Sequence, residues 1–170
     1  ILPPAVSMSH AHRESCLVFV GDAMPDATLP DGQGLQHRID ESCGKQLTAI
    51  LFWNERHPYA LDEFRELQHD LVPYHPLGVA TIAIHVGKPG ENYGALCEDY
   101  GRDVLCLLDA EGEYFRQVSS GPVPRIYLLD AERKVIWLDI EYSRTTRYEL
   151  RNALNYALQD ARSPADASEP

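Results

Sequence analysis

Two kinds of hydrophobic pattern alternate along the first half of the chain. Continuous apolar runs over residues 48–53 and 79–85 are typical of strands that are buried on both faces. Between these runs, apolar residues recur at the spacing of one helix face: Leu61, Phe64, Leu67 and Leu71. A strand, a helix and a strand over this length predict a βαβ unit with parallel strands and a right-handed crossover.

The second half of the chain continues with shorter elements. Its pattern predicts a helix over 92–100, a strand over 105–108, a hairpin of the strands 125–129 and 135–140, and a final helix to Leu158 capped by Thr145 or Thr146. The hairpin turn lacks the usual glycine. This order of elements predicts an α/β fold in which a central mixed sheet is flanked by helices on both faces.

The two ends of the chain show no such periodicity. Residues 1–16 mix proline, serine, histidine and charge, and we predict a mobile arm in which the spacing of His10 and His12 is incidental rather than a metal site. Residues 161–170 are small and polar and predict a disordered tail. One domain over residues 17–160 lies between them.

The acidic composition narrows the classes of partner. The 170 residues include 15 Lys and Arg against 26 Asp and Glu, a formal net charge of −11. An acidic surface repels phosphate backbones, so nucleic acid is not expected as a partner. No run of about eighteen apolar residues is present, so the sequence predicts no membrane span.

Four segments carry the pattern of a known family. Residues 20–31 read V-G-D-A-M-P-D-A-T-L-P-D, residues 44–53 read G-K-Q-L-T-A-I-L-F-W, residues 107–112 read L-L-D-A-E-G, and residues 122–130 read P-V-P-R-I-Y-L-L-D. In order and spacing the chain resembles the redoxins and TlpA/ResA-like thiol-disulfide oxidoreductases, which are relatives of the AhpC/TSA peroxiredoxins. The resemblance implies a thioredoxin-like fold, which agrees with the predicted elements.

The resemblance also implies an exported, periplasmic protein. Residues 1–6 could be the remnant of an export segment, although no basic region precedes them. The sequence itself leaves a cytoplasmic location open.

The redox motif of this family is replaced in the chain. The family pattern continues from Phe-Trp as A-x-W-C-x-x-C, whereas residues 52–60 read F-W-N-E-R-H-P-Y-A. The resemblance therefore assigns His57 to the first cysteine position and Ala60 to the second, with Pro58 in a first helical turn that tolerates proline. Without a thiolate at the helix N-terminus and a cysteine to resolve a mixed disulfide, we expect no dithiol catalysis at these positions.

His57 has two interpretations. A helix N-terminus disfavours imidazolium, so a neutral His57 could accept a proton or bind a metal. Because no nucleophile or second ligand is evident, the favoured interpretation is a capping residue on a degenerate site. The sequence therefore predicts no metal and no cofactor.

Pro124 matches the cis-proline that lies opposite the active-site helix in this family. A cis bond after Val123 would leave the backbone open to pair with an extended peptide, or the proline could serve only to shape the start of a strand. Nearby, Arg56 and Arg125 would add positive charge and favour an acidic partner, unless they are solvated or pair with a carboxylate such as Glu55.

Three aromatic residues belong to the same part of the predicted fold. Trp53, Tyr59 and Tyr127 could form an aromatic floor for the groove. Trp53 also fits the family pattern of a residue that lies largely in the core.

Four cysteines lie outside the motif positions. Cys106 falls inside an apolar strand, which favours a buried, inert thiol. Cys97 lies on the helix before it, so the two are a conceivable redox couple if the helix and strand faces meet. Cys16 and Cys43 could form a structural disulfide in an exported protein. None of the four lies at a helix N-terminus with basic neighbours, the environment that activates a thiol.

Two functions are compatible with these residues. The first is a non-catalytic module that binds a peptide or small ligand in the groove between His57 and Pro124. The alternative is an oxidoreductase or antioxidant redoxin that works through Cys97 and Cys106. The loss of the motif cysteines favours the first.

Overall fold

A five-stranded mixed sheet forms the centre of the computed structural model, which describes residues 2–56, 60–99 and 103–160. Its strands are β3 (Leu47–Trp53), β4 (Val79–Val86), β5 (Val104–Asp109), β6 (Arg125–Leu129) and β7 (Val135–Ile140). They lie in the order β5-β4-β3-β6-β7. β3, β4 and β5 are parallel, and β6 runs antiparallel to β3 and β7. The sheet confirms the predicted fold class.

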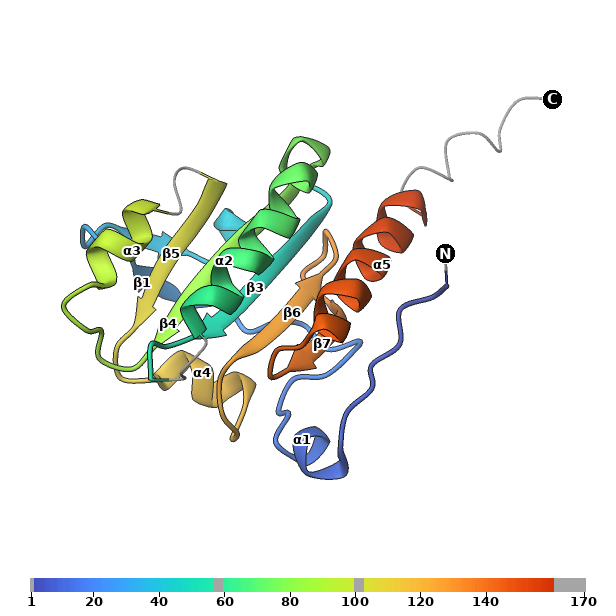
Figure 1. Cartoon of the computed structure of the whole chain (residues 1–170), viewed down its shortest axis with the longest axis horizontal. Helices are drawn as coiled ribbons and strands as arrows, with labels where there is room; N and C mark the ends of the chain where they lie inside the picture. The colour runs from blue at the N-terminus through green and yellow to red at the C-terminus, as the bar shows by residue number, and fades with distance from the viewer. Residues whose placement is uncertain (1, 57–59, 100–102, 161–170) are drawn as a thin grey trace.

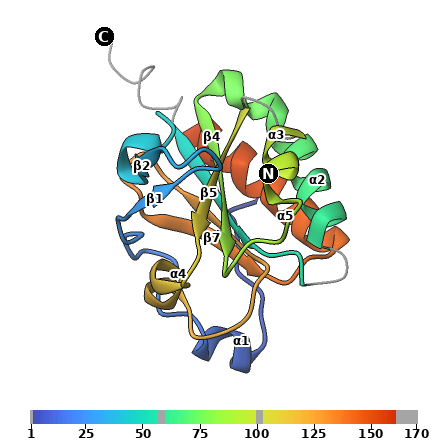
Figure 2. The same cartoon turned by 90° about the vertical axis from the view of Figure 1, so that its left-hand side faces the viewer.

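Helices cover both faces of the sheet (Figure 1). One face carries α2 (Ala60–Leu71), α3 (Tyr93–Asp99) and α5 (Arg144–Asp160), and the other carries α4 (Glu113–Val118). The remaining elements are α1 (His10–Glu14), the paired short strands β1 (Thr28–Pro30) and β2 (Gln36–Arg38), and the 3₁₀ helices η1 (Asp40–Ser42) and η2 (Val72–Leu77). Figure 2 shows β1 and β2 on the side of the sheet away from α2 and α5.

The helical spacing along α2 accounts for its packing. Phe64, Leu67 and Leu71 are each at most 6% exposed and face the sheet together with residues of α5. Burying a side chain of this size contributes roughly 1.5–3 kcal/mol. β3, at the centre of the sheet, is buried at every position, as its apolar run predicts.

The sequence pattern does not predict α4. This helix follows Gly112, which has φ 68°. The buried Asp109 carboxylate at the end of β5 accepts hydrogen bonds from the amides of Tyr114 (3.4 Å) and Phe115 (2.8 Å). These amides lack partners within the helix, so the carboxylate stabilises the first turn of α4.

The N-terminal residues differ from the mobile arm that the composition predicts. They contain α1, and Cys16 forms a β-bridge with Ser119. Farther toward the N-terminus, the Leu2 carbonyl accepts a hydrogen bond from Asn152 Nδ2 on α5 (3.0 Å). The segment is therefore packed against the domain. The predicted tail, residues 161–170, lies outside the described residues.

Two turns also differ in detail from the predictions. The amide of Thr146 donates to Ser143 Oγ (3.3 Å), so Ser143 rather than Thr145 or Thr146 supplies the cap of α5. In the hairpin between β6 and β7, Arg133 has φ 65° where a glycine is usual. Asp130 Oδ1 stabilises this turn by accepting from two amides at 2.9 Å.

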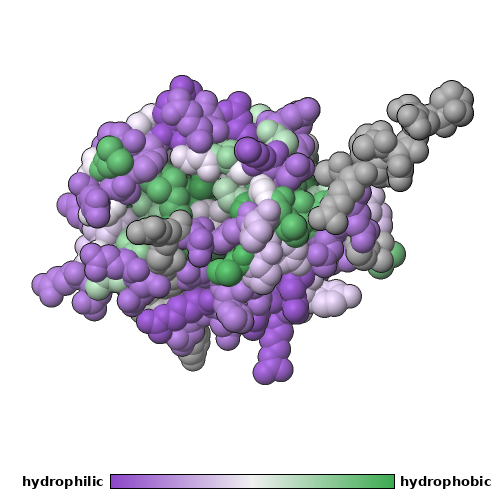
Figure 3. Space-filling view, turned by 90° about the horizontal axis from the view of Figure 1, so that it is seen from above, coloured by the Kyte–Doolittle hydropathy of each residue, from purple (hydrophilic) through white to green (hydrophobic). Residues whose placement is uncertain are grey.

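The end of the molecule where α2 and α5 finish is mostly hydrophilic, with hydrophobic side chains in small groups (Figure 3). This surface agrees with the acidic composition. Within the described part of the chain, no helix combines the length and apolar character needed to cross a membrane.

Candidate functional site

The redox position that the resemblance assigns lies where the chain leaves β3 and enters α2. β3 ends at Trp53 and α2 begins at Ala60. The other three residues of the replaced motif, His57, Pro58 and Tyr59, lie outside the described residues. In the segment after β3, Asn54 Oδ1 accepts from the Arg56 amide (3.1 Å).

Trp53 is a core residue at this end of β3. It is 3% exposed, and its ring stacks on Phe64 of α2 with centroids 5.0 Å apart. His85 of β4 meets the same ring edge-on at 5.0 Å. Of the two interpretations of Trp53 from the sequence, the core position is the one that the structure shows.

Glu55 is bound to the neighbouring strand. Its carboxylate accepts hydrogen bonds from His85 Nε2 and from the Gly90 amide, and His85 Nδ1 lies 3.0 Å from the Gly87 carbonyl. Burial opposes ionisation of Glu55, but the hydrogen bonds from His85 and the backbone outweigh it and hold the pKa of the carboxyl below its ordinary value. Glu55 therefore pairs with His85 rather than with Arg56, which is exposed.

The Val123–Pro124 peptide bond is cis, as the resemblance implies. Both residues are half-buried, and the Pro124 carbonyl accepts a hydrogen bond from the Glu141 amide (3.0 Å). Among the described residues, the amide and carbonyl of Val123 have no hydrogen-bond partner. We refer to Val123, Pro124 and the cavity beneath them as the proline site.

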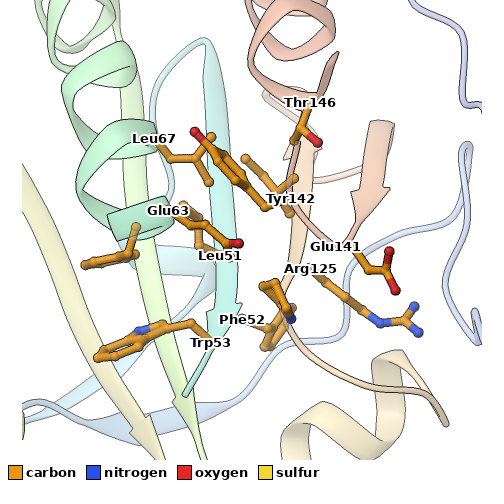
Figure 4. A pocket seen from close by; sticks show the side chains of 12 residues that line it. Leu51, Phe52, Trp53, Glu63, Leu67, Arg125, Glu141, Tyr142 and Thr146 are labelled. Atoms are coloured by element: carbon orange, nitrogen blue, oxygen red, sulfur yellow. The ribbon is translucent and has the colours of Figure 1, made fainter. Parts of the chain in front are cut away.

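The cavity of the proline site is nearly filled by side chains. It has a volume of about 20 Å³, enough for a single water molecule. Its lining comes from β3, α2, β6 and the segment before α5, as Figure 4 shows: Leu51, Phe52, Trp53, Glu63, Phe64, Leu67, Pro124, Arg125, Ile126, Glu141, Tyr142 and Thr146. The described residues form no ligand pocket of ordinary size at this place.

Arg125 does not supply charge to the proline site, contrary to the prediction. Its side chain is 2% exposed, and the guanidinium points away from the cavity (Figure 4). It donates to Ser15 Oγ (2.6 Å) and the Pro122 carbonyl (2.9 Å), and lies 3.5 Å from Cys16 Sγ. Arg125 therefore ties the N-terminal segment to the loop before Pro124.

The predicted aromatic floor is also wrong for Tyr127. Tyr127 is fully buried on the face of the sheet that carries α4, where it meets Phe52 edge-on with centroids 5.9 Å apart. Trp53 lies on the opposite face. Tyr59, the third residue of that prediction, is outside the described residues.

Cys97 and Cys106 do meet, at the β5 edge of the sheet. Cys97 lies on α3 and is half-buried, whereas Cys106 lies on β5 and is 6% exposed. Both line a hollow of about 430 Å³ that also includes Asp31 and Glu98. We refer to Cys97, Cys106 and Tyr93, which lies one helical turn before Cys97 on α3, as the thiol site.

The two thiols of this site affect each other's ionisation. The neighbouring Cys106 thiol, followed by the Tyr93 hydroxyl, favours the ionised form of Cys97 enough to outweigh burial, so the pKa of Cys97 lies below its ordinary value. The same contact with Cys97, followed by burial, raises the pKa of Cys106. The pair therefore loses its first proton more easily than an isolated thiol, and its second less easily. Tyr93 was not predicted as a site residue from the sequence. It lies four residues before Cys97, and this spacing places the two side chains on one helix face.

Cys16 and Cys43 are free thiols, so the disulfide that the sequence left open is not formed in the structure. Cys43 Sγ donates to the Ile39 carbonyl (3.2 Å), and burial raises the pKa of this thiol. Cys16 Sγ lies 3.4 Å from the His12 carbonyl.

The two histidines of α1 each lie near a carboxylate. His10 pairs with Glu14 (3.1 Å), and His12 lies 3.7 Å from Glu141. No group of three or more metal-ligating side chains occurs within residues 2–56, 60–99 and 103–160.

The sheet order, the helix that follows β3 and the cis-proline before β6 define the class of this protein as a thioredoxin-like redoxin. Its sequence matches the AhpC/TSA family over residues 20–138. The chain belongs to the AhpC/TSA family.

Two curated relatives carry the name thiol-disulfide oxidoreductase ResA. The one from Geobacillus thermodenitrificans is 30% identical over 125 residues, which are 72% of this chain and 70% of the relative. The one from Geobacillus kaustophilus is 28% identical over the same shares of the two chains. The chain is thus a homologue of thiol-disulfide oxidoreductases, with no cysteine at the two assigned motif positions.

Solved structures agree on the fold. A candidate protein disulfide isomerase from Bacteroides thetaiotaomicron superposes with a TM-score of 0.75 at 20% identity, over 87% of this chain and 95% of that one. A thiol:disulfide interchange protein from a Bacteroides species superposes with a TM-score of 0.67 at 16% identity, over 88% and 97%. At these identities the similarity establishes the thioredoxin-like fold alone.

Proposed function

We propose that this redoxin binds an extended polypeptide segment at the proline site, without dithiol chemistry at the motif positions of His57 and Ala60. The observation that carries the proposal is the unpaired backbone of Val123, whose amide and carbonyl have no hydrogen-bond partner among the described residues. An extended segment that lies alongside Val123 can donate to its carbonyl and accept from its amide. This is the pairing by which a strand is added to a protein surface.

The filled cavity favours a polypeptide over a small ligand. A pocket for a small molecule usually encloses about 300–1,000 Å³, whereas the cavity beneath Pro124 has about 20 Å³. The binding surface therefore consists of the backbone of Val123 and the half-buried ring of Pro124. A segment bound there would gain main-chain hydrogen bonds rather than a deep side-chain pocket.

The charges around the proline site favour a neutral or basic segment. The buried guanidinium of Arg125 is committed to Ser15 and Pro122, so it does not recruit an acidic partner. Glu63 and Glu141 line the cavity, and the whole chain carries a net charge of −11. Arg56 and Arg125 were both expected to add positive charge here, but of the two only Arg56 is exposed.

The test uses defined peptides and an NMR titration. ¹⁵N-labelled protein is titrated with three blocked peptides of alternating Val and Thr that carry a central Lys, Gln or Glu. We expect shift changes at the amides of Val123 and Gly121, with the Lys peptide binding best. Val123→Pro removes the donor and should weaken binding by about tenfold, because one hydrogen bond is worth about 1–1.5 kcal/mol.

Val123→Ala is the matched control, because it shortens the same side chain and keeps the amide. Its affinity should stay close to that of the unmodified protein. Equal affinities of Val123→Pro and Val123→Ala, or shift changes confined to the edge strands β5 and β7, would count against the proposal. The other hypothesis from the sequence, chemistry at Cys97 and Cys106, concerns a different surface and does not depend on this binding.

A further inference from the structure

The thiol site combines an accessible cysteine with a buried one. α3 lies against β5 at one edge of the sheet in both ribbon views (Figures 1 and 2). Cys97 is half-buried on α3 and faces the hollow, and the 6% exposed Cys106 lines the same hollow from β5. This is the division expected between a thiol that meets a substrate and a thiol that acts only afterwards.

The Tyr93 hydroxyl is the second feature of this site. Tyr93 is 7% exposed, and its buried hydroxyl has no hydrogen-bond partner among the described residues. Tyr93 lies one helical turn before Cys97 on α3, and its hydroxyl favours the ionised form of that thiol. The ring is held by an edge contact with His85 (5.2 Å) and lies 6.4 Å from Trp53. The site therefore holds a buried donor that no other described group uses.

The shape of the hollow leaves Cys97 open to a substrate. The hollow has a volume of about 430 Å³, within the range of small-molecule sites. Gly32 lies across from Cys97, and even a Cβ at this position would come within 4.0 Å of Cys97 Cβ. The absence of a side chain at Gly32 keeps that approach clear.

The charges at the hollow select among disulfides. Asp31 and Glu98 line it, and no basic side chain of the described residues does. Asp31 lies 2.8 Å from His37 and is a negative charge that acts on Cys97, and Glu98 adds a second carboxylate at the hollow. A cationic or neutral disulfide is therefore favoured over an anionic one such as oxidised glutathione.

We propose that Cys97 and Cys106 form a dithiol centre away from the motif positions, in which Cys97 attacks a cationic or neutral disulfide, Cys106 resolves the mixed disulfide, and the Tyr93 hydroxyl stabilises the Cys97 thiolate. This activity is independent of peptide binding at the proline site. It places thiol-disulfide exchange at the β5 edge, on residues that have no counterpart in the C-x-x-C motif.

The reaction proceeds in two displacements. The Cys97 thiolate attacks one sulfur of R–S–S–R. The substrate disulfide breaks, Cys97–S–S–R forms, and the leaving R–S⁻ takes up a proton. Cys106 then gives up its proton and attacks the Cys97 sulfur, which forms Cys97–S–S–Cys106 and expels the second R–S⁻ to be protonated. Two electrons and two protons thus pass from the cysteine pair to two molecules of R–SH.

The test is a single-turnover reaction of the full chain with cystamine at neutral pH, followed by peptide mapping. The unmodified protein should yield a Cys97–Cys106 disulfide. Cys106→Ser should stall with cysteamine attached to Cys97, and Cys97→Ser should leave Cys106 unmodified. Cys43 is the internal control, because it is also half-buried but has no thiol donor beside it. We expect Cys97 to react about tenfold faster than Cys43.

The substrate class is tested by the same mapping with oxidised glutathione. The rate ratio of cystamine to oxidised glutathione should be at least about threefold larger at Cys97 than at Cys43, because one unit charge at about 6 Å changes a rate by this factor in water. An equal ratio at the two cysteines would overturn the charge selection. The absence of a Cys97–Cys106 disulfide in the unmodified protein, which needs no substitution, would overturn the dithiol centre itself.

Discussion

The proline site and the thiol site, as proposed above, divide between them what a thiol-disulfide oxidoreductase normally combines. The proline site has the cis bond before Pro124 and a Val123 backbone without a hydrogen-bond partner among the described residues, and its assigned motif positions are without sulfur. The thiol site has two cysteines that line one hollow, yet neither lies at a helix N-terminus and no basic side chain of the described residues lines that hollow, whereas such features activate thiols elsewhere in proteins. Under the two proposals, peptide docking and thiol reactivity lie on separate surfaces of this fold.

The two sites are separated by strands but connected by packed rings. β4 and β3 lie between β5 and β6. On the face that carries α2, Trp53 lines the cavity of the proline site, and His85 contacts its ring. Tyr93 contacts His85 and lies one helical turn before Cys97 on α3. The carboxylate of Glu55 holds His85 from outside. Changes to these residues can show whether the two sites act independently.

The largest effect is expected from restoring sulfur to the motif positions. In a Cys97→Ser/Cys106→Ser background, His57→Cys with Ala60→Cys should raise the rate of insulin reduction by dithiothreitol about a hundredfold, because a helix N-terminus lowers the thiol pKa and the second cysteine resolves the intermediate intramolecularly. The background without the new cysteines is the control. A folded variant that forms no disulfide between positions 57 and 60 would show that the assigned register is wrong.

The sequence predicts the sheet well because burial leaves a periodic record. Local hydrophobic pattern is enough to predict the buried strands β3 and β4 from their apolar runs. It is also enough to predict the buried face of α2 from the spacing of Phe64, Leu67 and Leu71. α4 is different, because its first turn depends on Asp109, a residue of the preceding strand. Asp109 lies only a few residues before the helix that it caps, but a polar cap leaves no mark on the hydrophobic pattern from which helices are predicted.

The candidate site was harder to predict for two physical reasons. The residue type shows that Arg125 is charged, but not on which face of the sheet its side chain lies. Side chains alternate along β6, so Arg125 lies with Tyr127 on the α4 face, and its guanidinium points away from the cavity. The meeting of Cys97 with Cys106 depends on how α3 packs against β5. That is a contact between elements, and spacing along the chain does not determine it.

The second prediction concerns the connection between the sites. Glu55→Gln removes the charged partner of buried His85 and should lower the free energy of unfolding by about 2 kcal/mol at pH 7, measured by urea denaturation. Because the folded-state pKa of Glu55 is lowered, its contribution is complete above the unfolded-state pKa and is lost as the pH falls through the folded-state pKa. The difference between variant and parent should therefore shrink below about pH 4.

The exposed Glu132 provides the control for this experiment. It pairs with Lys134 at 3.8 Å on the surface, so Glu132→Gln should change stability by less than about 0.5 kcal/mol. Alkylation of Cys97 in Glu55→Gln should keep the parent rate if Glu55 anchors only the segment after β3. A changed rate at Cys97 would mean that the ring contacts couple the two sites.

The smallest effect is expected at Tyr93, and it is the most specific to the thiol site. Tyr93→Phe keeps the ring that packs on His85 and removes only the hydroxyl that favours ionisation of Cys97. The pKa of Cys97 should rise, so the rate of its alkylation at pH 7 should fall about three- to tenfold. At high pH, where the thiolate is fully formed in both proteins, the two rates should converge. Tyr148→Phe, at an exposed tyrosine of α5, should leave the profile unchanged.

An opposite change separates this electrostatic effect from simple loosening of α3. Asp31 is a negative charge that raises the pKa of Cys97, and Asp31→Asn keeps the oxygen that accepts from the Gln33 amide (2.8 Å). This substitution should lower the pKa of Cys97 and speed its alkylation at neutral pH, although Cys106 and Glu98 remain beside it. Loosening of the packing of α3 would change the alkylation rate of Cys97 in the same direction in Tyr93→Phe and Asp31→Asn. Rates that move in opposite directions therefore require that Cys97 reacts as a thiolate controlled by its immediate partners.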